Sequence, residues 1–440
     1  MRPELPGHVV VDPRSYERDV DLTDLPAAQQ MRTRCCIAGG GPAGMILGLL
    51  LARAGVEVMV LEKHADFLRD FRGDTVHPST LEIMYELDLL DAFLKRPHQE
   101  YRELGGRIGG VPVKLADFSH VPAHCRFLVL MPQWDFLDFL SDAAKRYPNF
   151  RLLMKTEVTD LLWSGDVVTG VRAKTPNGEL AITADLVVGA DGRHSTVREK
   201  AGLVRDEYGV PIDVLWMRLP KYPGDSTTTL GRIAAGAILV TLDRGDYLQC
   251  AFVIDKGGAD SLKQAGLESF RKVIARVAPE FADRTSALTD WDQIKLLTVT
   301  IDRLRQWAKA GLLCIGDCAH AMSPIGGIGI NLAIQDAVAT ANLLAGILRE
   351  RPPSLAELHR VQQRRELPTR LIQNLQMAIQ NSVMTRVLNL RADPKPPFIV
   401  KLLNRCAYLR RFPAWLVGIG FRPEHVRIAE QPPRADVTRA

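Results

Sequence analysis

The sequence predicts an α/β fold with a parallel central sheet, a separate antiparallel sheet and a helical carboxyl-terminal region. Over residues 35–63 a short apolar run, a glycine turn, a helix-forming run and a strand-like run follow one another. Two further apolar runs, 185–190 and 311–317, each end in a compact loop before a helix. These three stretches predict parallel strands, whereas the strand-like segments of residues 206–295 lack such alternation and predict antiparallel pairing.

Composition indicates a globular protein of two or three domains. The 440 residues are 46% hydrophobic and 24% charged, with a net charge of +5. The basic excess lies mainly in residues 347–440. Nucleic-acid binding would require that excess to be interleaved with aromatic side chains on one face, and we do not expect it here. The seven cysteines show no disulfide or metal spacing, which predicts buried, reduced thiols in a cytoplasmic protein and no metal site. Residues 1–30 lack a secretory pattern and are expected to be a flexible extension, with Met31 as an alternative start.

The first stretch contains GGGPAG, in which three glycines have separate predicted roles. Gly39 turns the chain off the strand, Gly41 lets a pyrophosphate approach the backbone, and Gly44 lets the helix pack on the sheet. Free N–H groups at the helix start favour an anion there. Glu62, which precedes Lys63 at the tip of the second strand, can accept the hydroxyls of a ribose. Because an acidic side chain disfavours a 2′-phosphate, we predict that this site binds the ADP half of FAD or NAD.

The next elements are a loop, a helix and a hairpin. Arg72 lies on the loop, where it can reach a phosphate or a flavin edge, and Ser79 or Thr80 is expected to cap the following helix. The glycine-rich residues 105–110 precede no helical pattern, so they predict a hairpin turn. Gln133 is expected to begin an amphipathic helix.

The second and third stretches place polar residues after buried strands. In GADGRHSTVR, Asp191 and Gly192 form a tight turn at a strand's carboxyl end, and Ser195 is expected to cap a short helix. In GDCAHAMSPIGGIGIN, Asp317 ends a strand and a glycine-rich loop leads into a helix near Ile330. His320 in that loop is a candidate proton donor, but a structural hydrogen bond is the favoured interpretation of it.

Two regions have less specific signals. One face of the antiparallel sheet is expected to cover a pocket, with candidate lining residues Trp216, Arg218, Tyr247 and Gln249, although core or edge packing is an equal alternative. Residues 396–422 mix aromatic and aliphatic with basic side chains. That mixture is typical of a helix at a membrane surface, and also of helices packed on the sheet domain or a partner subunit.

The three stretches in this order closely resemble the flavoprotein aromatic hydroxylases of the para-hydroxybenzoate hydroxylase type, which are single-component FAD monooxygenases. The resemblance spans about residues 33–348 and implies noncovalent FAD and transient NADH or NADPH. It implies a cofactor site of Gly39, Gly41, Gly44, Glu62, Lys63, Arg72, Gln133, Asp191, Gly192, Asp317, Pro324, Gly329, Ile330 and Asn331. Of these, Asp317 would bond the ribityl chain, Pro324 would lie beside the flavin ring, and the last three would present backbone N–H groups to its pyrimidine edge.

The resemblance also implies a division of the chain and a reaction. A discontinuous FAD-binding domain is expected over residues 31–105, 133–205 and 296–348, a substrate domain over 106–132 and 206–295, and a helical region over 349–440. NAD(P)H would reduce the flavin, O2 would form a C4a-hydroperoxide, and an aromatic or related electron-rich small molecule would be hydroxylated. The substrate-activating residue and the oligomeric state are not predicted.

Three alternatives remain open on the sequence. A quinone or prenyl-lipid oxidoreductase at a membrane surface would explain the basic, aromatic tail. A flavin-dependent halogenase shares the glycine pattern, but Trp291-Asp292-Gln293-Ile294 lacks the second tryptophan of the halogenase segment. A flavin-binding regulator or interaction protein without turnover is the third alternative, and substrate-independent NAD(P)H oxidation with peroxide release would argue against it.

Overall fold

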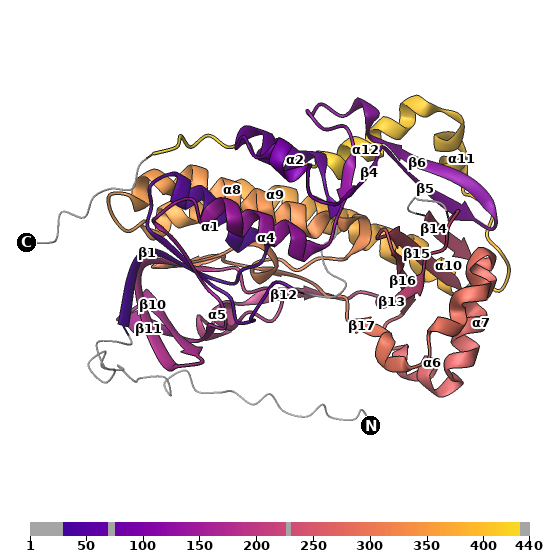
Figure 1. Cartoon of the computed structure of the whole chain (residues 1–440), viewed down its shortest axis with the longest axis horizontal. Helices are drawn as coiled ribbons and strands as arrows, with labels where there is room; N and C mark the ends of the chain where they lie inside the picture. Colours follow the sequence, from indigo (N-terminus) through magenta and orange to yellow (C-terminus); the bar gives the residue numbers. More distant parts are fainter. Residues whose placement is uncertain (1–29, 69–74, 226–229, 432–440) are drawn as a thin grey trace, which may run out of the picture.

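The computed structural model describes residues 30–68, 75–225 and 230–431. The molecule is elongated, with a parallel sheet under a layer of helices at one end and an antiparallel sheet at the other (Figure 1). The expectations for residues 1–29 and for Arg72 concern positions outside the described ranges.

The larger sheet is mainly parallel, as predicted. Its central order is β19-β20-β11-β1-β2-β8, and the hairpin strands β10 and β9 extend from β11. Strands β20, β11, β1, β2 and β8 run parallel, and their central residues are buried because such a sheet is covered on its faces. The bounds are β1 (Gln30–Ala38), β2 (Val58–Leu61), β8 (Phe150–Leu153), β9 (Glu157–Ser164), β10 (Val167–Thr175), β11 (Gly178–Gly189), β19 (Ala308–Lys309) and β20 (Leu312–Cys314).

A layer of helices lies on one side of this sheet (Figure 1). It consists of α1 (Pro42–Arg53), α4 (Gln133–Ala144), α8 (Ile328–Leu348) and α9 (Leu355–Ile379). The segment Ile325–Leu348 is long and apolar enough to cross a membrane, but 72% of its most apolar window is buried inside the protein. Since α8 packs between α1 and α9, its apolar character is that of a core helix.

Several local expectations are confirmed, and one is wrong. Gln133 begins α4, and Ser195 caps α5 (Thr196–Lys200) through a bond from Arg198 N. Neither Ser79 nor Thr80 caps the next helix, because α2 (Pro78–Glu86) begins after His77 without a side-chain cap. Proline at the first helical position has no N–H to satisfy, so the helix starts earlier than predicted. Short elements nearby are β3 (Thr75–Val76), α3 (Leu90–Phe93), β4 (Gln99–Tyr101) and β7 (Leu128–Leu130).

The second sheet has the order β17-β13-β16-β15-β14-β5-β6 and is antiparallel except between β14 and β5. The predicted hairpin at residues 105–110 joins β5 to β6, and the predicted domain boundary after residue 105 falls inside β5. One face packs on α6 (Ala259–Ala265) and α7 (Leu267–Val277). The strands are β5 (Glu103–Ile108), β6 (Val111–Asp117), β13 (Ile212–Pro220), β14 (Leu230–Ala234), β15 (Ala237–Asp243), β16 (Tyr247–Asp255) and β17 (Lys295–Leu297); β12 (Arg205–Tyr208) and β18 (Ile301–Leu304) pair separately.

The carboxyl-terminal region crosses from one sheet to the other and returns. After α9 come a π-helical turn, η9 (Gln380–Met384), and α10 (Thr385–Leu388). Helices α11 (Phe398–Arg405) and α12 (Arg411–Gly418), separated by the turn η10 (Ala407–Arg410), lie against β5 and β6 (Figure 1). The chain then runs back to α1, where Gln431 N donates to Arg53 O at 2.9 Å. Six of the seven cysteines are buried, and all seven are free.

Candidate functional site

The three sequence stretches meet at one edge of the parallel sheet. Ala38, the last residue of β1, lies opposite Gly189 of β11 and Leu61 of β2, and Gly189 in turn lies opposite Cys314 of β20. The glycine turn, the Asp-Gly turn and the loop after β20 therefore begin side by side. The carboxyl edge of parallel strands is where open α/β sheets bind ligands.

The glycines of the first loop serve different contacts. Gly39 has φ +107°, and a Cβ there would lie 2.4 Å from the Ala190 carbonyl oxygen. A Cβ at Gly44 would lie 2.0 Å from the Gly39 oxygen. In contrast, a Cβ at Gly41 would meet nothing within 4 Å, although Gly41 is the N-cap of α1 and no side chain caps the helix. Gly39 and Gly44 are therefore required by the packing of the protein itself. Gly41 and the α1 N–H groups, in contrast, face open space suited to an anion.

Glu62 ties the end of β2 to this loop. It is only 8% exposed, its Oε2 accepts from Gly40 N at 3.1 Å, and its Oε1 accepts from His64 N at 3.0 Å. These two bonds fix the carboxylate beside the glycine turn. The adjacent Lys63 is exposed.

Asp191 in the second loop has a local structural role. Its Oδ1 accepts from Ser195 Oγ at 2.5 Å and its Oδ2 accepts from Val197 N at 3.1 Å, so the carboxylate closes the start of α5. Burial raises the pKa of Asp191, although these two donors oppose the shift. The next residue, Gly192, has φ +84° and open space where a Cβ would be.

Two arginines, not predicted from the sequence, join the second loop to the third. Arg193 Nε donates to Asp317 Oδ2 at 3.2 Å, and its Nη2 donates to the Met322 oxygen at 3.3 Å. Arg198 Nη1 donates to the Cys318 oxygen at 3.0 Å. Arginine's fork of donors suits this bridging of several acceptors.

The third loop is held by a buried ionic cluster. Gly316 has φ +59° and donates its N–H to Asp336 Oδ2 at 3.1 Å. His320 Nε2 lies 2.5 Å from the same oxygen, and Arg365 Nε donates to Asp336 Oδ1 at 3.0 Å. Burial alone would raise the pKa of Asp336, but His320 and Arg365 outweigh it and hold that pKa below its usual value. The geometry favours the structural interpretation of His320 over proton donation.

The amino terminus of α8 follows this loop and has no side-chain cap. Gly327, its N-cap, has φ +62°, and Gly329 and Ile330 occupy the first turn. Asn331 clamps this turn to the chain before α2. Its Oδ1 accepts from His77 N at 2.9 Å and Thr80 Oγ1 at 2.8 Å, and its Nδ2 donates to the Thr75 and Gly327 oxygens at 3.0 and 3.1 Å.

Three buried glutamines on α9 and η9 hold the residues around Pro324. These glutamines were not predicted from the sequence. Gln376 Nε2 donates to the Ser323 and Ile325 oxygens, both at 3.0 Å, while its Oε1 accepts from Ser323 N at 3.2 Å. Gln373 donates to the Asp302 and Ala321 oxygens at 2.8 and 2.9 Å, and Gln380 donates to Ser323 Oγ at 2.5 Å. Their spacing of three and four residues along one helix face was the available signal.

The four candidate lining residues lie together on one face of the antiparallel sheet. Arg218 of β13 is the register partner of Gln249 of β16, and the Arg218 guanidinium lies 4.8 Å from the Tyr247 ring centre. Trp216 is two residues from Arg218 and on the same face. The opposite face packs on α7. The structure thus groups the four residues, and their contact with a substrate stays a prediction.

Residues 32–374 match the FAD-binding domain family. The chain is also 33% identical over 385 residues to 6-methylpretetramide 4-monooxygenase of Streptomyces rimosus, covering 87% of this chain and 92% of that protein. The chain belongs to the FAD-dependent aromatic monooxygenase family. It is therefore an FAD-dependent oxidoreductase, as the resemblance implied.

More distant relatives of this flavoprotein agree on family and fold. Para-nitrophenol 4-monooxygenase of Pseudomonas sp. strain WBC-3 is 23% identical and matches 71% of this chain and 78% of its own. The solved p-nitrophenol 4-monooxygenase PnpA of Pseudomonas putida DLL-E4 has a TM-score of 0.70 at 20% identity, covering 88% of this chain and 97% of that one. The names of these relatives do not favour the quinone or prenyl-lipid alternative.

Proposed function

We propose that this monooxygenase hydroxylates an electron-rich aromatic small molecule, using NADH or NADPH and O2, with FAD bound where the three loops meet. The observation that carries the proposal is the register of the strand ends. Ala38, Gly189 and Cys314 lie on neighbouring strands, so the three loops that the resemblance assigns to FAD share one sheet edge.

The fit of this edge to FAD is supported by its open positions and its uncapped helices. The α1 amino terminus and Gly41 would hold the pyrophosphate, Glu62 would accept from the ADP ribose, and Asp317 would accept from the ribityl chain. Partial positive charge at the α8 amino terminus suits the pyrimidine edge of a reduced flavin. The full proposed set also contains Gly39, Gly44, Lys63, Arg72, Gln133, Asp191, Gly192, Pro324, Gly329, Ile330 and Asn331.

The bound FAD would supply the redox chemistry, taking two electrons from NADH or NADPH and passing one oxygen atom of O2 to the substrate by the hydroperoxide route that the resemblance implies. The balance is substrate C–H, NAD(P)H, a proton and O2 giving substrate C–OH, NAD(P)⁺ and water. The chain's own part is to hold the cofactor, stabilise negative charge at the α8 amino terminus and keep water from the oxygen-transferring atom. Gln376 would contribute by fixing the residues on both sides of Pro324.

The relatives suggest which aromatic substrates to assay first. A relative named for 6-methylpretetramide is 33% identical over most of both chains, and one named for anhydrotetracycline is 27% identical over 84% of this chain. We therefore include fused-ring phenols in the proposed class, together with simple phenols. The face that carries Trp216, Arg218, Tyr247 and Gln249 would lie against this substrate, in a cytoplasmic enzyme.

The test is substrate-dependent oxygen transfer by the purified flavoprotein. A panel of fused-ring phenols, simple phenols and quinones is screened for stimulated NADH and NADPH oxidation, and the product is analysed by mass spectrometry under isotope-labelled O2. One labelled oxygen atom in the product is expected. If every compound that stimulates oxidation yields only peroxide and unchanged substrate, the hydroxylase proposal is wrong.

A further inference from the structure

The end of the molecule formed by α11, η10 and α12 carries large apolar side chains that are exposed within the described part of the chain. Phe398 is 81% exposed, Tyr408 69% and Phe412 68%. On α11, Phe398, Ile399 and Leu402 are spaced by three and four residues and lie on one side of the helix. We call these residues, together with the nearby basic side chains, the carboxyl-terminal patch; its members are Lys395, Phe398, Ile399, Lys401, Leu402, Arg405, Tyr408, Arg411 and Phe412.

The opposite side of α11 is firmly attached to the protein. Asn404 Oδ1 accepts from Lys114 N at 3.2 Å, and its Nδ2 donates to the Pro112 oxygen at 3.3 Å. These bonds seat the helix along the edge strand β6, so the exposed side is held in a fixed orientation. On α12, Ala414 is buried with Phe118 in the core beneath. The carboxyl-terminal patch is therefore held in a fixed position by contacts of α11 and α12 with the rest of the protein.

The charge on this surface has one sign. Residues 394–423 contain six lysines and arginines and no aspartate or glutamate. Glu103, an acidic side chain on the neighbouring strand β5, is paired with Lys114 at 2.6 Å and lies 3.8 Å from Arg410. A symmetric contact with a second copy would place basic groups against basic groups, which opposes self-association through this face.

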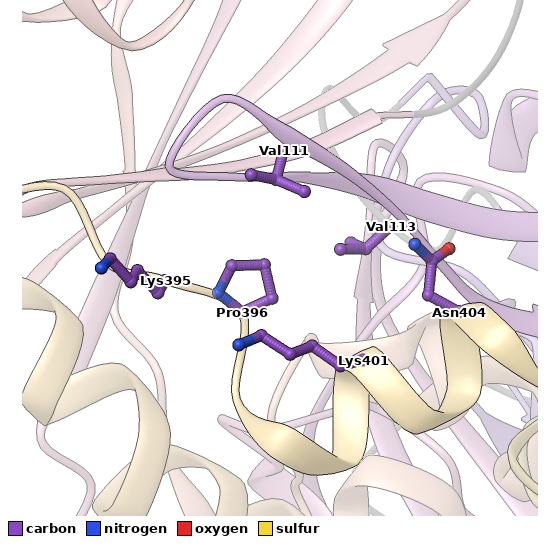
Figure 2. Close-up of a pocket in the computed structure, with 6 residues that line it drawn as sticks. All are labelled: Val111, Val113, Lys395, Pro396, Lys401 and Asn404. Carbon is purple, nitrogen blue, oxygen red and sulfur yellow. The ribbon is translucent and has the colours of Figure 1, made fainter.

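A pocket of about 300 Å³ opens beside the patch, between β6 and α11. Figure 2 shows Val111 and Val113 on the strand side, with Pro396 and Lys401 across from them. Lys395 and Asn404 complete the lining. A lining that combines apolar side chains with two lysines suits an acyl chain that carries an anionic head group.

We propose that the carboxyl-terminal patch docks the enzyme on an anionic phospholipid bilayer. Aromatic side chains enter the interface while lysines and arginines meet the lipid phosphates, as for amphipathic helices that lie in the membrane plane. The proposal goes beyond the reaction and does not require a lipid substrate.

The test uses the FAD-loaded full chain and sedimentation with two kinds of vesicle, phosphatidylcholine alone and phosphatidylcholine with phosphatidylglycerol in equal parts. We expect pelleting with the anionic vesicles only, and release by salt because screening weakens the attraction. Lys401→Glu with Arg405→Glu should weaken partitioning at least tenfold, since each basic group near such a surface contributes about fivefold. Phe398→Ser with Phe412→Ser should weaken it comparably.

Matched controls are Lys272→Glu, on the exposed side of α7, and Val204→Ser, at an exposed apolar position elsewhere; both should bind as the unchanged protein does. Flavin content reports folding of each variant. No pelleting with anionic vesicles, or pelleting that both patch variants retain, overturns the proposal. So does a dimer that Phe398→Ser with Phe412→Ser dissociates in the absence of vesicle binding. None of these outcomes bears on hydroxylation, which is assayed separately.

Discussion

Arg193 Nε donates to Asp317 Oδ2 at 3.2 Å and so joins the Asp-Gly loop after β11 to the loop after β20. Both side chains are about one-quarter to one-third exposed, at 25% and 34%, so the pair is partly screened by water. Its importance lies in orientation, because the bond holds the carboxylate that we assign to the ribityl chain.

Replacing this arginine should loosen FAD without unfolding the protein. Arg193→Gln should weaken FAD affinity by about fivefold to tenfold, a loss typical of one charge-assisted hydrogen bond. Flavin fluorescence titration of the apoprotein measures the affinity. The control is Arg305→Gln, which breaks an exposed pair with Asp206 at 2.9 Å outside the three loops. Equal affinity in both variants would show that Arg193 does not position Asp317 for the cofactor.

Gly41→Ala tests whether a ligand occupies the open space at the start of α1. The protein has room for the added methyl group, which would meet nothing within 4 Å, so the apoprotein should keep its stability. A pyrophosphate close to the backbone would clash with it, and purified protein should contain at least tenfold less FAD. Gly346→Ala in α8, where a Cβ also meets nothing within 4 Å, is the control and should retain full flavin. Full occupancy in Gly41→Ala would exclude the pyrophosphate assignment.

The ends of the three strands could be predicted from the sequence because each consists of an apolar run followed by a glycine-containing loop and then a helix. Gly39 shows this, since its positive φ and its close approach to Ala190 leave no alternative to glycine. The hydrogen bonds that hold the loops in place could not be predicted, because they join residues far apart in the chain. The clamp of Asn331 on His77 and the bonds of Gln376 to Ser323 span 254 and 53 residues, and only packing brings them together.

The start of α2 was mispredicted for a local reason. Ser79 and Thr80 are good capping residues, but Pro78 before them already fits the first helical position. The helix therefore includes both, and Thr80 instead donates its hydroxyl to Asn331. A tertiary partner outweighed the local capping preference.

Asn331→Ala should destabilise the apoprotein strongly. The substitution leaves two donors and two acceptors without their partner in a buried setting, with an expected loss of about 3 kcal/mol or more in unfolding free energy. Urea unfolding followed by circular dichroism measures it. Asn342→Ala removes two bonds near the surface and should cost only about 1 kcal/mol. Similar midpoints for the two variants would contradict the role of Asn331 as a clamp.

Gln376→Leu should impair coupling of NAD(P)H oxidation to hydroxylation. The change leaves the backbone on both sides of Pro324 without its partners, so the loop beside the proposed ring position would shift and admit water. We expect a severalfold higher peroxide yield per NAD(P)H oxidised, with KM for NAD(P)H little changed. Gln363→Leu, on the exposed side of the same helix, is the control. If coupling is unchanged in Gln376→Leu, Gln376 does not position the loop around Pro324 for oxygen transfer.

The lowered pKa of the buried His77 ring should make the free energy of unfolding decrease as the pH falls into the weakly acidic range. Burial lowers the pKa of His77 to about 4, although the carbonyls of Val417 and Gly326 favour the protonated ring. The unfolded histidine has a pKa near 6.5, so between about pH 6.5 and 4 the unfolded chain binds the extra proton and stability falls as the pH falls. The loss from this group approaches about 3 kcal/mol at pH 4. His77→Asn, whose amide can still donate to Val417, should flatten this part of the urea-unfolding pH profile, whereas His194→Asn at an exposed position should keep it. If the two variants give the same slope, His77 is not the group that titrates.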